Sequence, residues 1–117
     1  MPVHSWSKIA RETLNPKAER QAIHTSRMTV ARLYLKAGAV VPLHHHENEQ
    51  ITMLMAGRLK FIFPDEEVIV AAGDVVEIAP NRPHSVEALE DSEAWDLFSP
   101  RREDWLSGDD AYLRGSR

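Results

Sequence analysis

From about residue 20 onward, short runs of hydrophobic and polar residues alternate and are separated by turn-forming residues. Runs of this kind, rich in Val, Ile, Leu and Phe, are typical of β-strands, and Gly, Pro, Asn and Asp between them indicate turns. Turns are expected around Gly38, Gly57 and Gly73 and at Pro64-Asp65. The predicted strands cover residues 20–24, 28–36, 40–46, 50–55, 59–63, 68–71, 75–79, 84–89 and 93–99.

This pattern predicts one all-β domain with almost no helix. Roughly eight to ten short strands at regular spacing are typical of a sandwich or barrel, and polar residues within the strands favour antiparallel sheets. We assign the barrel to residues 19–106. Residues 1–18 are polar, are broken at Asn15-Pro16 and are expected to be irregular, whereas residues 107–117 form a charged C-terminal tail. A helical turn is expected near Glu103–Leu106.

The composition narrows the classes of function. The chain has 117 residues, enough for one domain, and a formal net charge of −4 with no basic stripe, so nucleic acid is not an expected partner. It has no cysteine, which excludes disulfides, thiolate ligands and a cysteine nucleophile. No secretory signal precedes the strands, and the apolar stretches are too short to cross a bilayer. We therefore expect a cytoplasmic protein that does not interact with membranes.

Histidines are placed between strand-like segments in a way that indicates a metal site. Side chains alternate faces along a strand, so His44 and His46 share a face while His45 points the other way. Gln50 begins the next predicted strand, and His84 follows a loop bounded by prolines. Three neutral imidazoles and one amide oxygen would suit a divalent transition metal such as Zn, Ni, Fe, Mn or Cu. The sequence does not select among these ions.

The spacing of these residues resembles the first motif of the cupins. That motif runs Gly, five residues, His-x-His, three residues, Glu, six residues, Gly. The chain has Gly38, five residues, His44-His45-His46, three residues, Gln50, six residues and Gly57. Gln50 therefore stands where the motif usually has Glu.

A second cupin-like motif leads from Gly73 through a proline loop to His84, with Ala79 where proline is common. The resemblance extends over about residues 27–104. It implies a small antiparallel jelly-roll barrel and, usually, a homodimer. It also implies a metal bound by His44, His46, Gln50 and His84.

The last predicted strand carries a narrower resemblance. Its ending, Asp96-Leu97-Phe98-Ser99-Pro100-Arg101-Arg102, is similar to that of the pectin-degradation cupins, which linearise 4,5-unsaturated monouronates. These cupins also have Glu-Gln at the position of Glu49-Gln50. The resemblance implies that Asp96, Phe98 and Arg102 lie in the active site.

The residue types suggest a role for each of these side chains. An inward-facing Asp96 could act as a general acid or base, or form a structural ion pair with Arg102 or Arg32. Arg102 could hold a substrate carboxylate through two parallel hydrogen bonds, or be an ordinary surface charge. Phe98 could form a wall of the pocket or belong to the core.

Three functions remain open at this stage. A neutral Gln50 ligand leaves the full charge of the cation, which favours Lewis-acid chemistry of lyase or isomerase type on a small acidic sugar or keto acid. The alternatives are a metal-dependent dioxygenase and a non-catalytic cupin that binds a small ligand. In each case the expected partner is a small molecule, in the first a carboxylate-bearing substrate.

Overall fold

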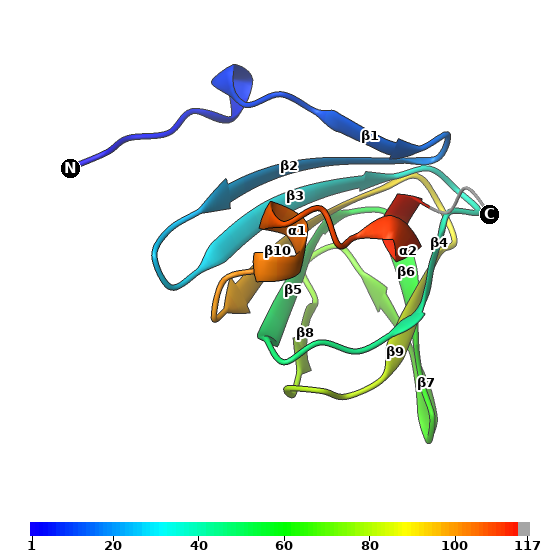
Figure 1. Ribbon diagram of the computed structural model, residues 1–117. Helices are drawn as coiled ribbons and strands as arrows, with labels where there is room; N and C mark the ends of the chain where they lie inside the picture. Colours follow the sequence, from blue (N-terminus) through cyan, green and yellow to red (C-terminus); the bar gives the residue numbers. More distant parts are fainter. Residues whose placement is uncertain (115–117) are drawn as a thin grey trace.

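The computed structural model describes residues 1–114, which form ten strands in two antiparallel sheets (Figure 1). The six-stranded sheet has the order β1-β2-β3-β10-β5-β8, and the four-stranded sheet has the order β4-β9-β6-β7. The strands are β1 (Glu12–Asn15), β2 (Ala18–His24), β3 (Thr29–Leu35), β4 (Val40–His44), β5 (Glu49–Ala56), β6 (Arg58–Phe63), β7 (Glu66–Ala71), β8 (Val75–Ile78), β9 (His84–Ala88) and β10 (Ser92–Ser99). The predicted antiparallel, all-β jelly roll is confirmed.

The two sheets enclose one hydrophobic core. Along β10 the buried positions alternate with half-buried ones, so that Ala94, Asp96 and Phe98 face inward while Trp95 and Leu97 face outward. The same alternation along β3, β5, β6 and β9 fills the space between the sheets with apolar side chains. The core includes Leu33, Leu54, Leu59, Phe61, Ile78, Val86, Ala88, Ala94 and Phe98.

Gly57 makes the tight connection between β5 and β6. Its φ of 90° lies in the left-handed region that favours glycine. A Cβ atom at this position would also overlap the side chain of Ser92 and the carbonyl oxygen of Asp91. The glycine that ends the first sequence motif is therefore required by both conformation and space.

The N-terminal segment contains more regular structure than we expected. Within residues 1–18, which we predicted to be irregular, Trp6–Lys8 form a 3-10 helix (η1) and Glu12–Asn15 form β1. β1 is an edge strand that pairs with β2, and Leu14 is its one buried residue. β1 is held by backbone pairing and by an ion pair of 3.1 Å between Glu12 and Arg20. Its residues do not alternate between hydrophobic and polar, so the sequence pattern did not predict a strand here.

The C-terminal segment packs against the barrel. Helix α1 (Glu103–Leu106) occupies the position of the predicted helical turn, and α2 (Ala111–Arg114) contacts β1 and β4. Asp110 is buried in an ion pair of 2.9 Å with Arg20, and Leu113 is buried as well. Of the tail predicted at 107–117, residues 115–117 lie outside the described residues. No helix in residues 1–114 has the length and apolar character needed to cross a membrane.

Candidate metal centre

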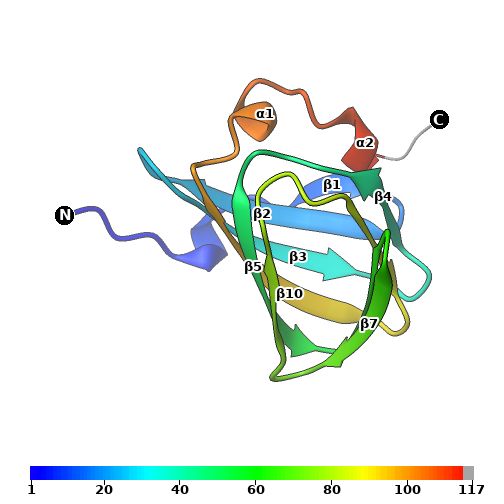
Figure 2. The ribbon, with the colours of Figure 1, turned by 90° about the horizontal axis from the view of Figure 1, so that it is seen from below.

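Three histidines meet at one end of the barrel. His44 on β4 lies directly opposite His84 on β9 in the sheet register, and His46 follows two residues after His44. Their ligating nitrogen atoms all lie within 4.8 Å of one another, and His45 is exposed. Figure 2 shows the connection between β4 and β5, which carries His46, running alongside α1 and α2. The structure thus brings the three predicted histidines together and turns His45 away from them.

Each of these histidines is held in the tautomer that leaves Nε2 free to bind a metal. The Nδ1 atoms of His44, His46 and His84 lie 2.8, 3.0 and 2.8 Å from backbone carbonyl oxygens, which can only accept. Nδ1 is therefore the protonated nitrogen, and Nε2 keeps its lone pair. Burial lowers the pKa of His44 and His46 to about 4 and also lowers the pKa of His84. All three rings are neutral near pH 7. The three carbonyl oxygens belong to Pro42, Asn48 and Arg82.

Gln50 adds an oxygen donor from the opposite sheet. Its Oε1 lies 3.0 Å from Nε2 of His46, while its amide nitrogen donates to the hydroxyl of Thr52 at 2.9 Å. Two acceptor atoms therefore face each other, because Nε2 of a neutral His46 carries no proton. A cation between them would turn this repulsion into two favourable contacts. Three imidazole nitrogens and one neutral oxygen fit a first-row divalent metal.

Asp96 is buried next to this donor set. Its Oδ1 accepts a hydrogen bond of 2.6 Å from the hydroxyl of Thr52. Arg32 pairs with Glu93 instead, so among residues 1–114 Asp96 has neither of the ion pairs that we considered from the sequence. Burial raises the pKa of Asp96 to about 6, against the opposing effects of the Thr52 hydrogen bond and the charge of Arg102. A carboxyl group with this pKa can both donate and accept a proton near neutral pH.

Arg102 is an interior residue rather than the surface charge considered as its alternative. Its side chain is 2% exposed, and its Nε and Nη2 donate to the carboxylate of Asp104 at 2.9 and 2.7 Å. Nη2 also donates to the hydroxyl of Tyr112 at 2.5 Å. The guanidinium group lies over the rings of Phe98 and Trp105. Within the described part of the chain, Nη1 makes no hydrogen bond. Asp104 therefore occupies the Nε–Nη2 edge that could have held a substrate carboxylate through two parallel hydrogen bonds.

Aromatic rings form the walls of the centre. The ring of Phe98 meets the ring of His46 edge to face, with centroids 5.7 Å apart, and is 1% exposed. Tyr112 lies 4.8 Å from the ring of His44. Sequence reasoning missed Tyr112, Trp105 and Thr52 as site residues. Thr52 shares strand parity with Gln50 and could have been found from it, whereas Tyr112 reaches the site only because the chain returns to the barrel end.

The space at the centre is small. A cavity of about 50 Å³ is lined by residues that include His44, Gln50, His84, Asp96, Arg102 and Tyr112. This is room for a few water molecules, since a cavity needs about 10–15 Å³ of such volume to hold one. An open depression of about 360 Å³ lies beside His46, and its lining shares no residue with that of the central cavity.

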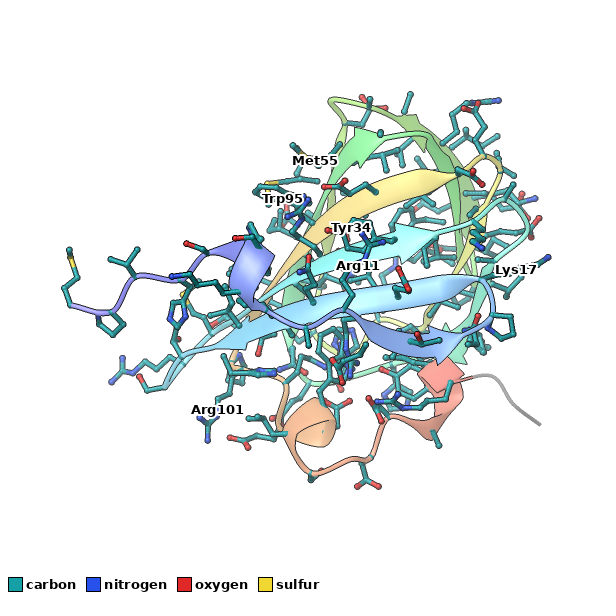
Figure 3. The ribbon with its side chains drawn as sticks, turned by 90° about the horizontal axis from the view of Figure 1, so that it is seen from above. Arg11, Lys17, Tyr34, Met55, Trp95 and Arg101 are labelled. Carbon is teal, nitrogen blue, oxygen red and sulfur yellow. The ribbon has the colours of Figure 1, made fainter. Side chains whose placement is uncertain are left out.

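Larger hollows lie elsewhere, on the outer side of the six-stranded sheet. Two open depressions of about 450 and 510 Å³ are both lined in part by Arg11 and Tyr34, which lie together on that face in Figure 3. The guanidinium of Arg11 is 3.6 Å from the centre of the Tyr34 ring. Neither hollow contains the histidines, so size alone does not identify the site.

Comparison with known proteins agrees with this geometry. The family model described as "Cupin domain" matches residues 31–96, which include His44, His46, Gln50, His84 and Asp96. No curated protein matches the chain.

Solved structures resemble the chain over most of its length. KdgF from Halomonas sp. is 30% identical, with a TM-score of 0.79, and the match covers 86% of this chain and 95% of that one. An RmlC-like cupin from Shewanella frigidimarina is 20% identical, with a TM-score of 0.82 and coverage of 87% and 93%. A predicted oxalate decarboxylase from Thermotoga maritima is 21% identical, with a TM-score of 0.72 and coverage of 85% and 98%. The last two show the fold alone.

Proposed function

The chain belongs to the cupin family, and from this we propose that it is a metal-dependent enzyme that opens the ring of a small acidic sugar. The reaction would be of lyase or isomerase type, and a 4,5-unsaturated monouronate is the substrate that we favour. The observation that carries the proposal is the position of Asp96, a buried carboxyl group without an ion pair in residues 1–114, next to the converging histidines. The Asp96–Arg102 ending, which resembles that of pectin-degradation cupins, supports the choice of substrate.

The proposed ligands are His44, His46, Gln50 and His84. A divalent metal bound there would supply Lewis acidity towards a carboxylate, hydroxyl or carbonyl oxygen of the substrate. Because Gln50 is neutral, the ligands do not reduce the charge of the cation.

The protein's own residues would bind the sugar and move one proton. The free Nη1 of Arg102 would donate to the substrate carboxylate, and Phe98 would keep water from the reacting atoms. Asp96 would take the proton of the anomeric hydroxyl as the bond between the anomeric carbon and the ring oxygen breaks, which would form an aldehyde and leave the electron pair on the former ring oxygen as an enolate. It would then return a proton to the neighbouring alkene carbon, which gives a linear keto acid. The product is an isomer of the substrate, so the reaction needs neither oxygen nor a reductant.

The test is turnover of 4,5-unsaturated monouronates by the metal-loaded protein without oxygen, followed through the loss of the conjugated alkene's ultraviolet absorbance. We expect Asp96→Asn to lower kcat by about 10²–10⁴-fold, the usual contribution of a positioned acid or base, without loss of bound metal. Glu93→Gln on the same strand is the control, because Glu93 faces outward.

Two results would contradict the proposal. Oxygen consumption with uronates unchanged would favour a dioxygenase. Binding of a uronate with no turnover, and with equal affinity in Asp96→Asn, would favour a non-catalytic binding protein.

We also propose that the chain forms a homodimer through the outer face of the six-stranded sheet. Trp95, Met53 and Val75 are paired in register across β10, β5 and β8 on that face, and Met55 lies nearby, 49% exposed (Figure 3). Apolar residues grouped across neighbouring strands favour association. Light scattering should give twice the chain mass of 13.3 kDa, and Met53→Glu should give the monomer. A wild-type monomer would contradict this proposal.

A further inference from the structure

Three buried side chains form a chain of hydrogen bonds that ends at the candidate metal centre. Gln50 and Thr52 are two residues apart on β5 and face the same way, and Asp96 on β10 is the register partner of Thr52. The amide nitrogen of Gln50 donates to Oγ1 of Thr52 at 2.9 Å, and the hydroxyl of Thr52 donates to Oδ1 of Asp96 at 2.6 Å. The three side chains are among the buried polar residues of the protein.

When Asp96 is ionised, the direction of these hydrogen bonds is fixed by the number of available protons. A threonine hydroxyl has one hydrogen, and Oδ1 of Asp96 accepts it. Oγ1 of Thr52 can then only accept from Gln50, so the amide group must present its nitrogen to Thr52. Its oxygen, Oε1, is consequently turned towards Nε2 of His46.

The opposite orientation of the Gln50 amide would suit the metal-free histidine better. With the amide turned over, its N–H would donate to the lone pair of His46 Nε2, and the repulsion between two acceptors would disappear. The same rotation would place Oε1 against Oγ1 of Thr52, whose only hydrogen is already used, and would leave both oxygens without a donor. Thr52 and His46 therefore favour opposite orientations of one side chain.

We propose that Thr52 is a positioning residue that holds Gln50 in the orientation that binds a metal. It does so before the metal arrives, which avoids the cost of turning a buried amide on binding. This inference rests on the proposed metal site and adds to it a residue that does not contact the ion. Residues that orient metal ligands typically contribute 10–100-fold to metal affinity.

The experiment measures Zn²⁺ affinity by competition with a chromophoric chelator and follows Co²⁺ binding through its visible spectrum. Thr52→Val keeps the shape of the side chain but removes the hydroxyl, and we expect it to weaken Zn²⁺ binding about 10–100-fold. Thr52→Ser keeps the hydroxyl and should restore wild-type affinity. Thr52→Ala is the alternative if the valine variant does not fold, and thermal unfolding of the metal-free proteins reports their integrity.

The same Thr52 substitution made in a Gln50→Glu variant shows whether Thr52 acts by orienting Gln50 or through packing. In Gln50→Glu the ligand has two equivalent oxygens, so it has no wrong orientation. Adding Thr52→Val to this variant should change Zn²⁺ affinity by no more than about twofold, the usual scatter of independent substitutions. A loss as large as in the Gln50 background would overturn the inference, because it would show that Thr52 acts through packing.

The result also distinguishes this inference from the proposed function. If the wild-type protein binds Zn²⁺ and Co²⁺ and Thr52→Val binds them equally well, only the role of Thr52 is overturned. If the wild-type protein binds neither ion, the metal site itself is overturned, and the role of Thr52 with it.

Discussion

The interior of the barrel has two halves of opposite character, and the same strands build both. β5 places Gln50 and Thr52 in one half and Leu54 in the other, all of them buried. The buried positions of β9 also change from polar to apolar, from His84 to Val86. The polar half lies at the end covered by α1 and α2, where Phe98 also packs, and the apolar half contains core side chains such as Leu54, Leu59 and Phe61.

The comparison separates the residues that stabilise the fold from those that do its chemistry. Apolar side chains stabilise the barrel through burial, which needs no particular partner. Buried polar groups cost free energy unless each has a hydrogen-bond partner. In the polar half the side chains hydrogen-bond to one another, and these hydrogen bonds fix the orientation of each side chain. A substitution in the apolar half should therefore change the free energy of unfolding, and a substitution in the polar half should change metal affinity.

The largest expected effect is a loss of stability in the apolar half. Phe61 is 1% exposed, and Phe61→Ala should lower the free energy of unfolding by about 3–5 kcal/mol because it removes contacts and leaves a cavity. Urea denaturation of the metal-free protein measures this change. Ile62→Ala, on the neighbouring outward-facing position, should cost less. The separation of the two halves would fail if the folded Phe61→Ala protein also lost its affinity for Zn²⁺.

The matching substitution in the polar half should act on metal binding. His84→Ala removes one proposed ligand, and we expect Zn²⁺ affinity to fall by more than about 100-fold, which corresponds to about 2.7 kcal/mol. Chelator competition measures it, and His4→Ala, at an exposed histidine far along the chain, is the control. Unchanged affinity would remove His84 from the ligand set.

A smaller effect of the polar half should be a dependence of the free energy of unfolding on pH. In the unfolded metal-free chain the histidines bind protons below about 6.5, whereas burial keeps the pKa of His44 and His46 at about 4 in the folded protein. The free energy of unfolding should therefore fall as the pH drops from about 6.5 towards 4. Asp96, whose pKa is raised to about 6 by burial, binds its proton more readily in the folded protein. It therefore contributes in the opposite direction, but it is one group against two histidines.

Denaturation at several pH values measures the slope of stability against pH. The slope should be smaller in His44→Gln, which has one fewer buried imidazole, than in the wild-type protein. The same slope in both proteins would contradict the assignment of this pH dependence to the histidines.

The smallest effect is expected at the middle histidine of the triplet. His45 is exposed, and His45→Ala should change the free energy of unfolding by less than about 0.5 kcal/mol. Its Zn²⁺ affinity should equal that of the wild-type protein. A weakened site in this variant would mean that His45 can take the place of a neighbouring histidine.

Much of the fold could be predicted from local patterns. The turns at Gly38, Gly57 and Gly73 bound the strands, and the alternation along β10 placed Asp96 and Phe98 inside the barrel, as observed. β1 escaped prediction because an edge strand is held mainly by backbone pairing, which leaves little trace in side-chain type. The packing of residues 110–114 escaped it because the buried pair of Arg20 and Asp110 joins opposite ends of the chain.

The sequence alone determined which donor atoms the site contains and which of them share a face, because side chains alternate along a strand with a period of two residues. Only the tertiary structure decided that the backbone N–H of Arg102 binds Thr29, that Tyr112 covers His44 and that the hydroxyl of Thr52 donates to Asp96. These contacts depend on how distant segments meet and on how a limited number of protons is shared among buried atoms. No local pattern of residues encodes either of these.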